Sequence, residues 1–114
     1  MPPKTTIEKL SSSSPDVTVF KITGTLGFHE KNVLERLFNE CARRGLARVL
    51  FEVSELESLG GGCARIIRET AQQGGLAIGL VGVTRTVLKF LKNEDVPRIV
   101  IANTLDEAIP LVKA

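Results

Sequence analysis

The residues best suited to binding or catalysis are four consecutive positions, Gly60-Gly61-Gly62-Cys63. They directly precede apolar residues at helical spacing, so we expect them at the N-terminus of a helix. Glycine lets backbone N–H groups approach an anion closely at such a position. The run lacks the lysine of a Walker motif and the spacing of a dinucleotide-binding loop. It therefore favours a tight turn beside a partner surface, with a bound anion, nucleotide or lipid head group as the alternative.

Cys63 is also the candidate nucleophile of the chain. In the first turn of a helix, the N-terminal dipole lowers the pKa of a thiol and favours the thiolate. The alternative is that Cys63 packs as a small buried hydrophobic residue, as Cys41 is expected to do in the preceding helix. One histidine and two well-separated cysteines give no metal-ligand spacing. The sequence therefore predicts no metal and no cofactor.

Five basic side chains are expected on the exposed faces of the second and third helices. Such a surface would dock an acidic partner or an anionic lipid head group, and the alternative is an ordinary solvated face. The five residues are Arg65, Arg68, Arg85, Lys89 and Lys92.

The composition is typical of one cytoplasmic domain. The chain has 114 residues, 43% of them hydrophobic, so we expect a single domain over 1–114 with loosely ordered ends at 1–4 and 113–114. A formal charge of +2 and the absence of Trp and Tyr argue against nucleic-acid binding, because proteins that bind single strands stack the bases on aromatic rings. No apolar run reaches the roughly 18 residues of a membrane span, and no signal peptide is recognisable.

Hydrophobic periodicity and turn residues predict an α/β fold that would position these residues. We expect a mixed, mostly parallel sheet of about five strands with about four helices, beginning with an antiparallel hairpin. Residues 24–27 should break the second strand, and 54–62 should form a loop. The predicted strands are 5–10, 17–22, 47–53, 76–81 and 99–102; the predicted helices are 28–44, one from 63 to the stop at Gly74-Gly75, 84–92, and one that begins with a capping box from Thr104 to Glu107.

Three stretches of the sequence resemble the STAS family in order and spacing. They are VFKITGTL, ARVLFEVSEL and LAIGLVGVTRTVLKFLK, which together cover most of residues 17–112. The resemblance implies a STAS-like fold of the SpoIIaa type and the role of an anti-sigma factor antagonist. Such a domain is a non-enzymatic bacterial module of signal transduction and transcription regulation that works by protein-protein interaction.

The resemblance also implies a change at the phosphorylation site. In the antagonist branch, the loop after the central strand reads Asp-Ser-Ser-Gly, and a kinase phosphorylates a serine at the helix start. The phosphoacceptor position is Gly62 here, and the acidic residue that follows the first Gly-x-Leu is replaced by Gly27. Glycine cannot be phosphorylated, so we expect no phosphorylation at this position. Ser58 is the candidate under a shifted alignment, and Ser54 ranks below it.

A Cys63–His29 dyad is a further implication, because the family pairs the two strands that precede these residues. A cysteine-dependent enzyme is therefore a third hypothesis, although the prediction is that the chain is not an enzyme.

The predicted partner is a protein. The resemblance points to an anti-sigma factor or serine-kinase-like protein, or to other STAS domains, and a weak homo-oligomer is included in the prediction. The residues predicted to contact the partner lie after the second strand and around the glycine run: Gly27, Phe28, His29, Ser58, Gly60, Gly61, Gly62, Cys63 and Arg65.

Overall fold

A mixed sheet forms the centre of the protein. The computed structural model describes residues 5–11, 14–73, 75–94 and 99–113. Within these residues the sheet has six strands in the order β1-β2-β3-β5-β6, with β4 paired to the end of β2. The β1–β2 pair is antiparallel, and the other pairs are parallel. The strands are β1 (Thr6–Leu10), β2 (Thr18–Leu26), β3 (Arg48–Glu52), β4 (Leu56–Leu59), β5 (Ala77–Val81) and β6 (Ile99–Ala102).

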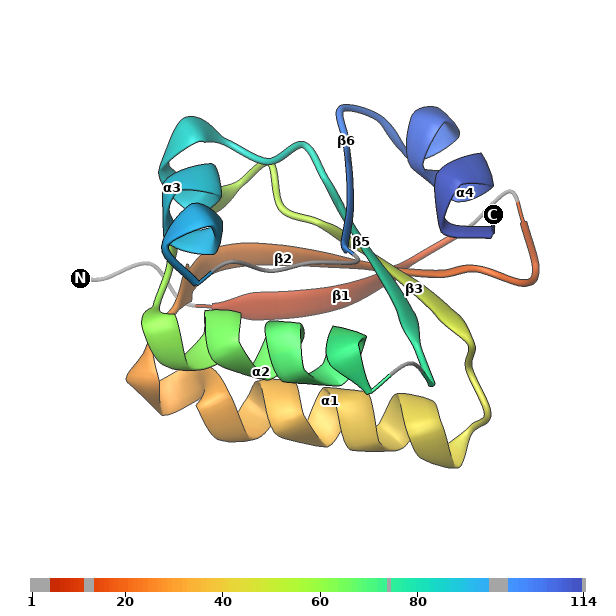
Figure 1. The fold of residues 1–114 in the computed structure, drawn as a ribbon, viewed down its shortest axis with the longest axis horizontal. Helices are drawn as coiled ribbons and strands as arrows, with labels where there is room; N and C mark the ends of the chain where they lie inside the picture. The colour runs from red at the N-terminus through yellow and green to blue at the C-terminus, as the bar shows by residue number, and fades with distance from the viewer. Residues whose placement is uncertain (1–4, 12–13, 74, 95–98, 114) are drawn as a thin grey trace.

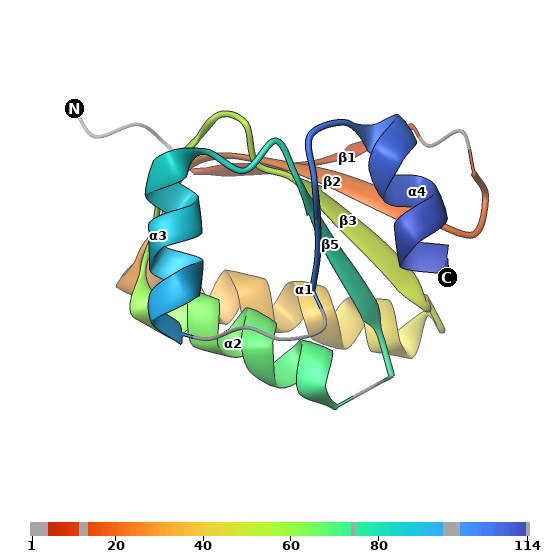
Figure 2. The same cartoon turned by 45° about the horizontal axis from the view of Figure 1, so that its top comes forward.

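Helices cover both faces of this sheet, as Figures 1 and 2 show. One core cluster joins the sheet to the first three α-helices, and a second cluster joins its other face to α4. The described helices are the 3-10 turn η1 (Phe28–Glu30), α1 (Lys31–Arg43), α2 (Gly61–Gln72), α3 (Arg85–Glu94) and α4 (Leu105–Lys113). The α/β class, the mostly parallel sheet and the four helices agree with the prediction.

The apolar run of β3 explains why helices lie on both faces. Successive side chains of a strand point to opposite sides, and a strand covered on both sides is apolar throughout. Val49 and Phe51 belong to the cluster under α1 and α2, whereas Leu50 belongs to the cluster under α4. The Phe51 ring meets the Phe38 ring of α1 edge to face, with centroids 5.7 Å apart. This central strand therefore anchors both layers.

The structure corrects two expectations near the centre of the sheet. Residues 24–27 do not end the second strand, because β2 continues to Leu26 through an irregularity between Gly24 and Thr25. Gly24 has φ 89°, a conformation that glycine adopts without strain. The predicted loop over 54–62 contains β4, whose Leu56 and Leu59 are buried. A four-residue strand with only two inward leucines has too short a pattern to be recognised from sequence.

The end of the chain follows the predicted capping box. The Glu107 N–H donates to Thr104 Oγ1 at 3.2 Å, and the Glu107 carboxylate accepts from the Asn103 N–H at 3.3 Å. The helix continues past Pro110 to Lys113, whose ammonium lies 3.9 Å from the Asp16 carboxylate. Of the ends expected to be loosely ordered, 1–4 and 114 lie outside the described residues.

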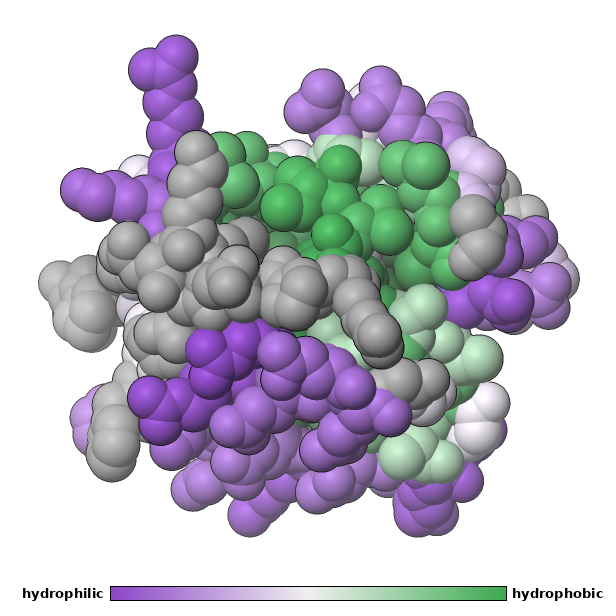
Figure 3. Space-filling view, viewed as in Figure 1, coloured by the Kyte–Doolittle hydropathy of each residue, from purple (hydrophilic) through white to green (hydrophobic). Residues whose placement is uncertain are grey.

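The two edges of the sheet differ in chemistry. The edge strand β1 carries exposed Glu8 and Lys9, which discourage pairing with another strand. The opposite edge, β6, carries Ile101 with 48% of its surface exposed. Figure 3 shows apolar residues gathered over β6 between α3 and α4, with hydrophilic residues gathered over α1 and α2.

Candidate functional site

The turn after β2 lies directly against the N-terminus of α2. Leu26 and Leu59 are partners in the parallel β2–β4 pair, and the Gly60 N–H donates to the Leu26 carbonyl at 2.6 Å. Gly60 is the N-cap residue of α2, with an extended backbone. The strand β4 therefore brings the glycine run beside the turn at Gly27. The sequence prediction assumed that the turn at Gly27 and the glycine run lie close together. It did not include β4, the strand that brings them together.

The carbonyl of Gly27 joins three segments at this junction. It accepts a hydrogen bond from the Glu30 N–H at 3.1 Å, which closes η1. It also accepts from the Cys63 thiol at 3.4 Å, which attaches the first turn of α2 to the same turn. The hydroxyl of Thr5, just before β1, lies 2.5 Å from the Thr25 carbonyl and 3.1 Å from the Glu30 carboxylate. These contacts hold the junction in one arrangement.

Two glycines of the run have close neighbours at the position a Cβ would occupy. A Cβ on Gly60 would lie 3.2 Å from the Leu26 carbonyl oxygen and 3.5 Å from the Gly27 Cα. A Cβ on Gly62 would lie 2.8 Å from Cδ of Lys31. The aliphatic stem of Lys31, the first residue of α1, therefore lies directly against Gly62.

Cys63 is buried, as expected if it packs as a small hydrophobic residue, and its thiol lacks the lowered pKa that the nucleophile hypothesis required. Its side chain has no exposed surface, and burial raises the pKa of the thiol from 9.0 to about 11, with a further increase from Glu30. The nearby Lys31 acts in the opposite direction but does not offset this. Desolvation disfavours the thiolate more than the helix N-terminus stabilises it. Near neutral pH the Cys63 thiol is therefore protonated, which removes the support for a Cys63–His29 dyad.

The remaining residues predicted to contact a partner divide between surface and interior. His29 and Arg65 are exposed. Phe28 opens η1 and Gly61 is the first residue of α2. Ser58 is half-buried within β4, opposite Thr25, and so is not at a helix start.

The basic residues lie on two helices, as predicted. Arg65, Arg85 and Lys89 are exposed, whereas Arg68 is half-buried and carries an interaction of its own. The side chain of Lys92 lies outside the described part of the chain. Ser54, the lower-ranked phosphorylation candidate, is exposed, and its N–H donates to the Glu52 carboxylate at 2.9 Å.

Sequence reasoning missed three residues of the junction: Thr5, Glu30 and Lys31. Each depends on a contact between segments distant in the sequence, so no local pattern marks it. Only the position of Lys31 carried a signal, because it follows directly on a turn that was predicted to lie near the glycine run.

The described side chains show no assembled metal site. No group of three or more His, Cys, Asp or Glu residues among them is arranged to hold an ion. None of the described helices is both long and apolar enough to cross a membrane. The site therefore offers a shaped surface with backbone N–H groups and two exposed polar side chains, His29 and Arg65.

Comparisons with known proteins agree with this geometry. The family model of the STAS domain matches residues 10–108. An anti-sigma factor antagonist from Mycobacterium paratuberculosis superposes with a TM-score of 0.78 at 18% identity, covering 96% of each chain. The unphosphorylated form of the anti-sigma factor antagonist SpoIIAA superposes with a TM-score of 0.71 at 16% identity, covering 95% of this chain and 96% of SpoIIAA.

The same fold also occurs as one part of a larger protein. The murine anion transporter Slc26a9 superposes with a TM-score of 0.71 at 12% identity, over 90% of this chain and 18% of the transporter. At these identities the structural likeness concerns the fold. A comparison with curated sequences gave no match.

Proposed function

The chain belongs to the STAS domain family, and from this premise we propose that it is a non-enzymatic regulatory module that binds a protein partner, as anti-sigma factor antagonists do. The observation that carries the proposal is the junction of Gly27 with the N-terminus of α2, which presents the loop after β2 and the start of a helix side by side. The proposed partner is an anti-sigma factor or another STAS domain, and the proposed place of action is the cytoplasm.

The contact surface in this proposal consists of Gly27, His29 and the first turn of α2 up to the exposed Arg65. Its support is physical: the Leu26 carbonyl accepts from the Gly60 N–H and the Gly27 carbonyl accepts from the Cys63 thiol, and these bonds make the surface rigid before a partner arrives. A preformed surface avoids part of the ordering cost of association. Cys63 is buried and does not contact the partner in this proposal. It supports the surface by donating a hydrogen bond to the Gly27 carbonyl.

We further propose that serine phosphorylation at the family position does not switch this binding. Phosphorylation would add nearly two negative charges beside the N–H groups of a helix start. Gly62 has no acceptor hydroxyl, and the stem of Lys31 occupies the space above it. Ser58 is half-buried in the pairing between β4 and β2, which is a poor position for a kinase substrate.

The substitution Gly27→Arg tests the docking surface. A Cβ on Gly27 would meet no atom closer than 3.8 Å, so the variant should fold, while the long side chain would project into the interface. We expect its affinity for the anti-sigma factor of the same organism, measured by titration calorimetry, to fall about tenfold or more. The control Gln72→Arg adds the same side chain at an exposed position at the far end of α2. Equal binding by Gly27→Arg and the unchanged chain would contradict the proposed surface.

Intact mass spectrometry after incubation with that anti-sigma factor and ATP tests the absence of a phosphorylation switch. The expected result is an unchanged mass and an unchanged affinity. A stoichiometric gain of one phosphate would overturn this part of the proposal and leave the docking surface standing.

The alternative is a small-ligand module that holds an anion, nucleotide or lipid head group on the glycine run. It has less support, because the Gly60 N–H is already bonded to Leu26 and the stem of Lys31 covers Gly62. A ligand that binds only the folded chain raises its melting temperature. We expect ATP and inorganic phosphate to leave that temperature unchanged, and a rise would favour the alternative.

A further inference from the structure

A groove of about 490 Å³ opens between α1 and α2, toward their C-terminal ends. Its apolar part is formed by Phe38 and Ile66, which are almost completely buried, together with Leu46 and Leu76. The first two come from facing positions of the two helices, and the last two come from the segments that follow them. The groove lies at the end of α2 away from Gly60.

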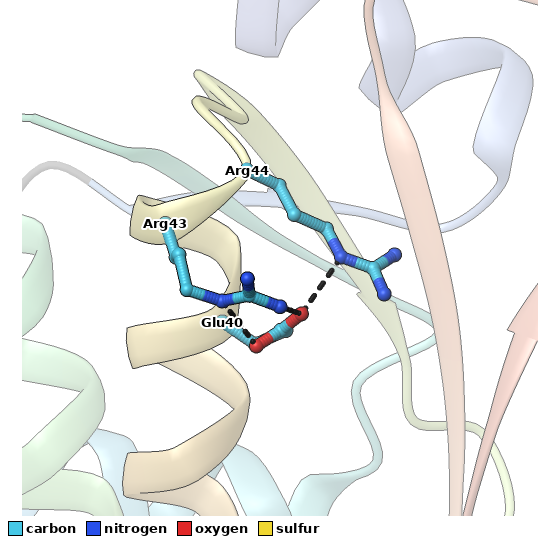
Figure 4. A network of polar contacts seen from close by, with 3 residues as sticks. All are labelled: Glu40, Arg43 and Arg44. Carbon is cyan, nitrogen blue, oxygen red and sulfur yellow. Dashed lines mark hydrogen bonds and ion pairs between the residues drawn. The ribbon is translucent and has the colours of Figure 1, made fainter.

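The groove is acidic. Among the described residues, its lining includes the exposed carboxylates of Glu35 and Glu69 and no lysine or arginine. The two arginines at the end of α1 are engaged elsewhere: Arg43 and Arg44 both bind the Glu40 carboxylate, as Figure 4 shows. These contacts hold the pKa of Glu40 below its usual value, chiefly through the hydrogen bond from Arg43. None of the salt bridges among the described residues involves Glu35 or Glu69, so both carboxylates of the groove are open to cations from another molecule.

Helix α3 presents the complementary chemistry. Arg85 and Lys89 are both exposed and lie four residues apart, so they project from the same side of the helix. No acidic residue lies between them, and the half-buried Leu88 stands beside Lys89. Figure 1 shows α3 at the opposite end of the molecule from the C-terminal ends of α1 and α2.

We propose that the α1–α2 groove binds α3 of a second copy of this chain, with Arg85 and Lys89 of one copy facing Glu35 and Glu69 of the other. Charge complementarity selects α3 as the occupant, and Leu88 supplies an apolar contact for the floor of the groove. The two surfaces are different patches of one molecule, so the contact is heterologous. A pair keeps one unused groove on one copy and one unused α3 on the other, so further copies add head to tail.

Sedimentation velocity over a range of protein concentrations tests this contact. The unchanged chain is expected to show a weight-average mass that rises with concentration at low salt and falls toward that of the monomer at higher salt, because salt screens the four charges. The double variant E35K/E69K and the double variant R85E/K89E are each expected to raise the apparent dissociation constant about tenfold or more. The control E57K makes the same charge change at an exposed residue of β4.

Mixing the two double variants gives the decisive result. E35K/E69K retains the cationic α3, R85E/K89E retains the acidic groove, and the reversed groove and the reversed α3 are complementary to each other. Each variant should therefore be monomeric alone, while the mixture should associate head to tail with the two variants alternating. Circular dichroism and thermal melting establish that both variants are folded. A chain that stays monomeric at every concentration overturns the proposal. So does self-association that persists in either double variant, because another surface would then be responsible.

Discussion

Gly62 and Lys31 together determine the chemistry at the start of α2. The absence of a hydroxyl at Gly62 removes the phosphoacceptor, and the missing Cβ also makes room for a neighbouring side chain. The stem of Lys31 uses that room, since a Cβ at position 62 would lie 2.8 Å from its Cδ. Under the proposed correspondence of Gly62 with the phosphoacceptor serine, a cationic residue lies where a phosphorylated relative would present a dianion. The sequence alone indicates the glycine, and only the structure indicates the neighbouring lysine.

The reactivity of Cys63 is a prediction at this scale. In a Cys41→Ala variant, which leaves one thiol, native Cys63 should react with iodoacetamide near neutral pH more slowly than a simple thiol, because burial raises its pKa to about 11. Mass spectrometry follows the alkylation, and the same variant in denaturant is the control. Alkylation of the native variant at the rate of the denatured one would contradict the buried thiol.

The same pKa has a consequence for stability. The folded pKa of Cys63 is raised above the value of 9.0 expected in the unfolded chain, so the folded state binds the proton more tightly. This contribution to the free energy of unfolding is fully present below pH 9.0 and is lost as the pH rises toward about 11. Cys63→Ala should lack this pH dependence.

At the scale of elements, a four-residue strand determines the geometry of the site. The strand β4 has only four residues, but its pairing with β2 brings Gly60 within hydrogen-bond reach of Leu26. That pairing requires β2 to extend beyond its irregularity at Gly24. A short strand beside an irregular one carries little sequence pattern, and this explains why the segment was expected to be a loop.

The packing of β5 provides a test at the same scale. Gly79 lies in the middle of β5, opposite Leu50 of β3, and a Cβ there would lie 2.4 Å from Cδ2 of Leu50. Gly79→Ala should therefore overpack the core and lower the free energy of unfolding by about 1–3 kcal/mol. Denaturant titration measures the change.

Gly75→Ala is the matched control for that substitution. A Cβ on Gly75 would meet no atom within 4 Å, so its effect should stay within about 0.5 kcal/mol. Equal effects of the two substitutions would show that the close packing of Gly79 against Leu50 does not limit stability.

At the scale of the whole molecule, α2 separates two surfaces. Its first turn belongs to the proposed docking surface, and its last turns line the acidic groove. Gly62 and Thr70 are about 12 Å apart along the helix axis, from a rise of about 1.5 Å per residue. The layered fold can therefore present one surface to a regulatory partner and another to a second copy.

This separation predicts independent effects of substitutions on the two surfaces, if both proposals hold. Gly27→Arg should weaken binding to the anti-sigma factor without changing self-association, and E69K should do the reverse. In the double variant the two free-energy changes should simply add, because distant sites that share no contacts behave independently. Calorimetry and sedimentation of the four proteins measure both quantities, and a strong coupling would place both activities on one surface.

Much of the architecture could be read from local patterns. Apolar runs such as that of β3 and helical stripes such as that of α1 depend on residues close in the sequence, and they predicted the order of elements and the mixed sheet. The helix cap at Thr104 was also predicted from residues close together in the sequence. Even the neighbourhood of Gly27 and the glycine run was anticipated, through the family resemblance.

Tertiary structure alone decided the properties that depend on contacts between distant segments. The sequence by itself determined that a helix begins at the glycine run and that Gly62 lacks a hydroxyl. It could not determine that Lys31 covers that glycine, that Cys63 is buried with a raised pKa, or that Glu35 and Glu69 line one groove. The physical reason is that periodicity records which side of an element is apolar, whereas solvent exclusion and the proximity of charges depend on which elements pack together.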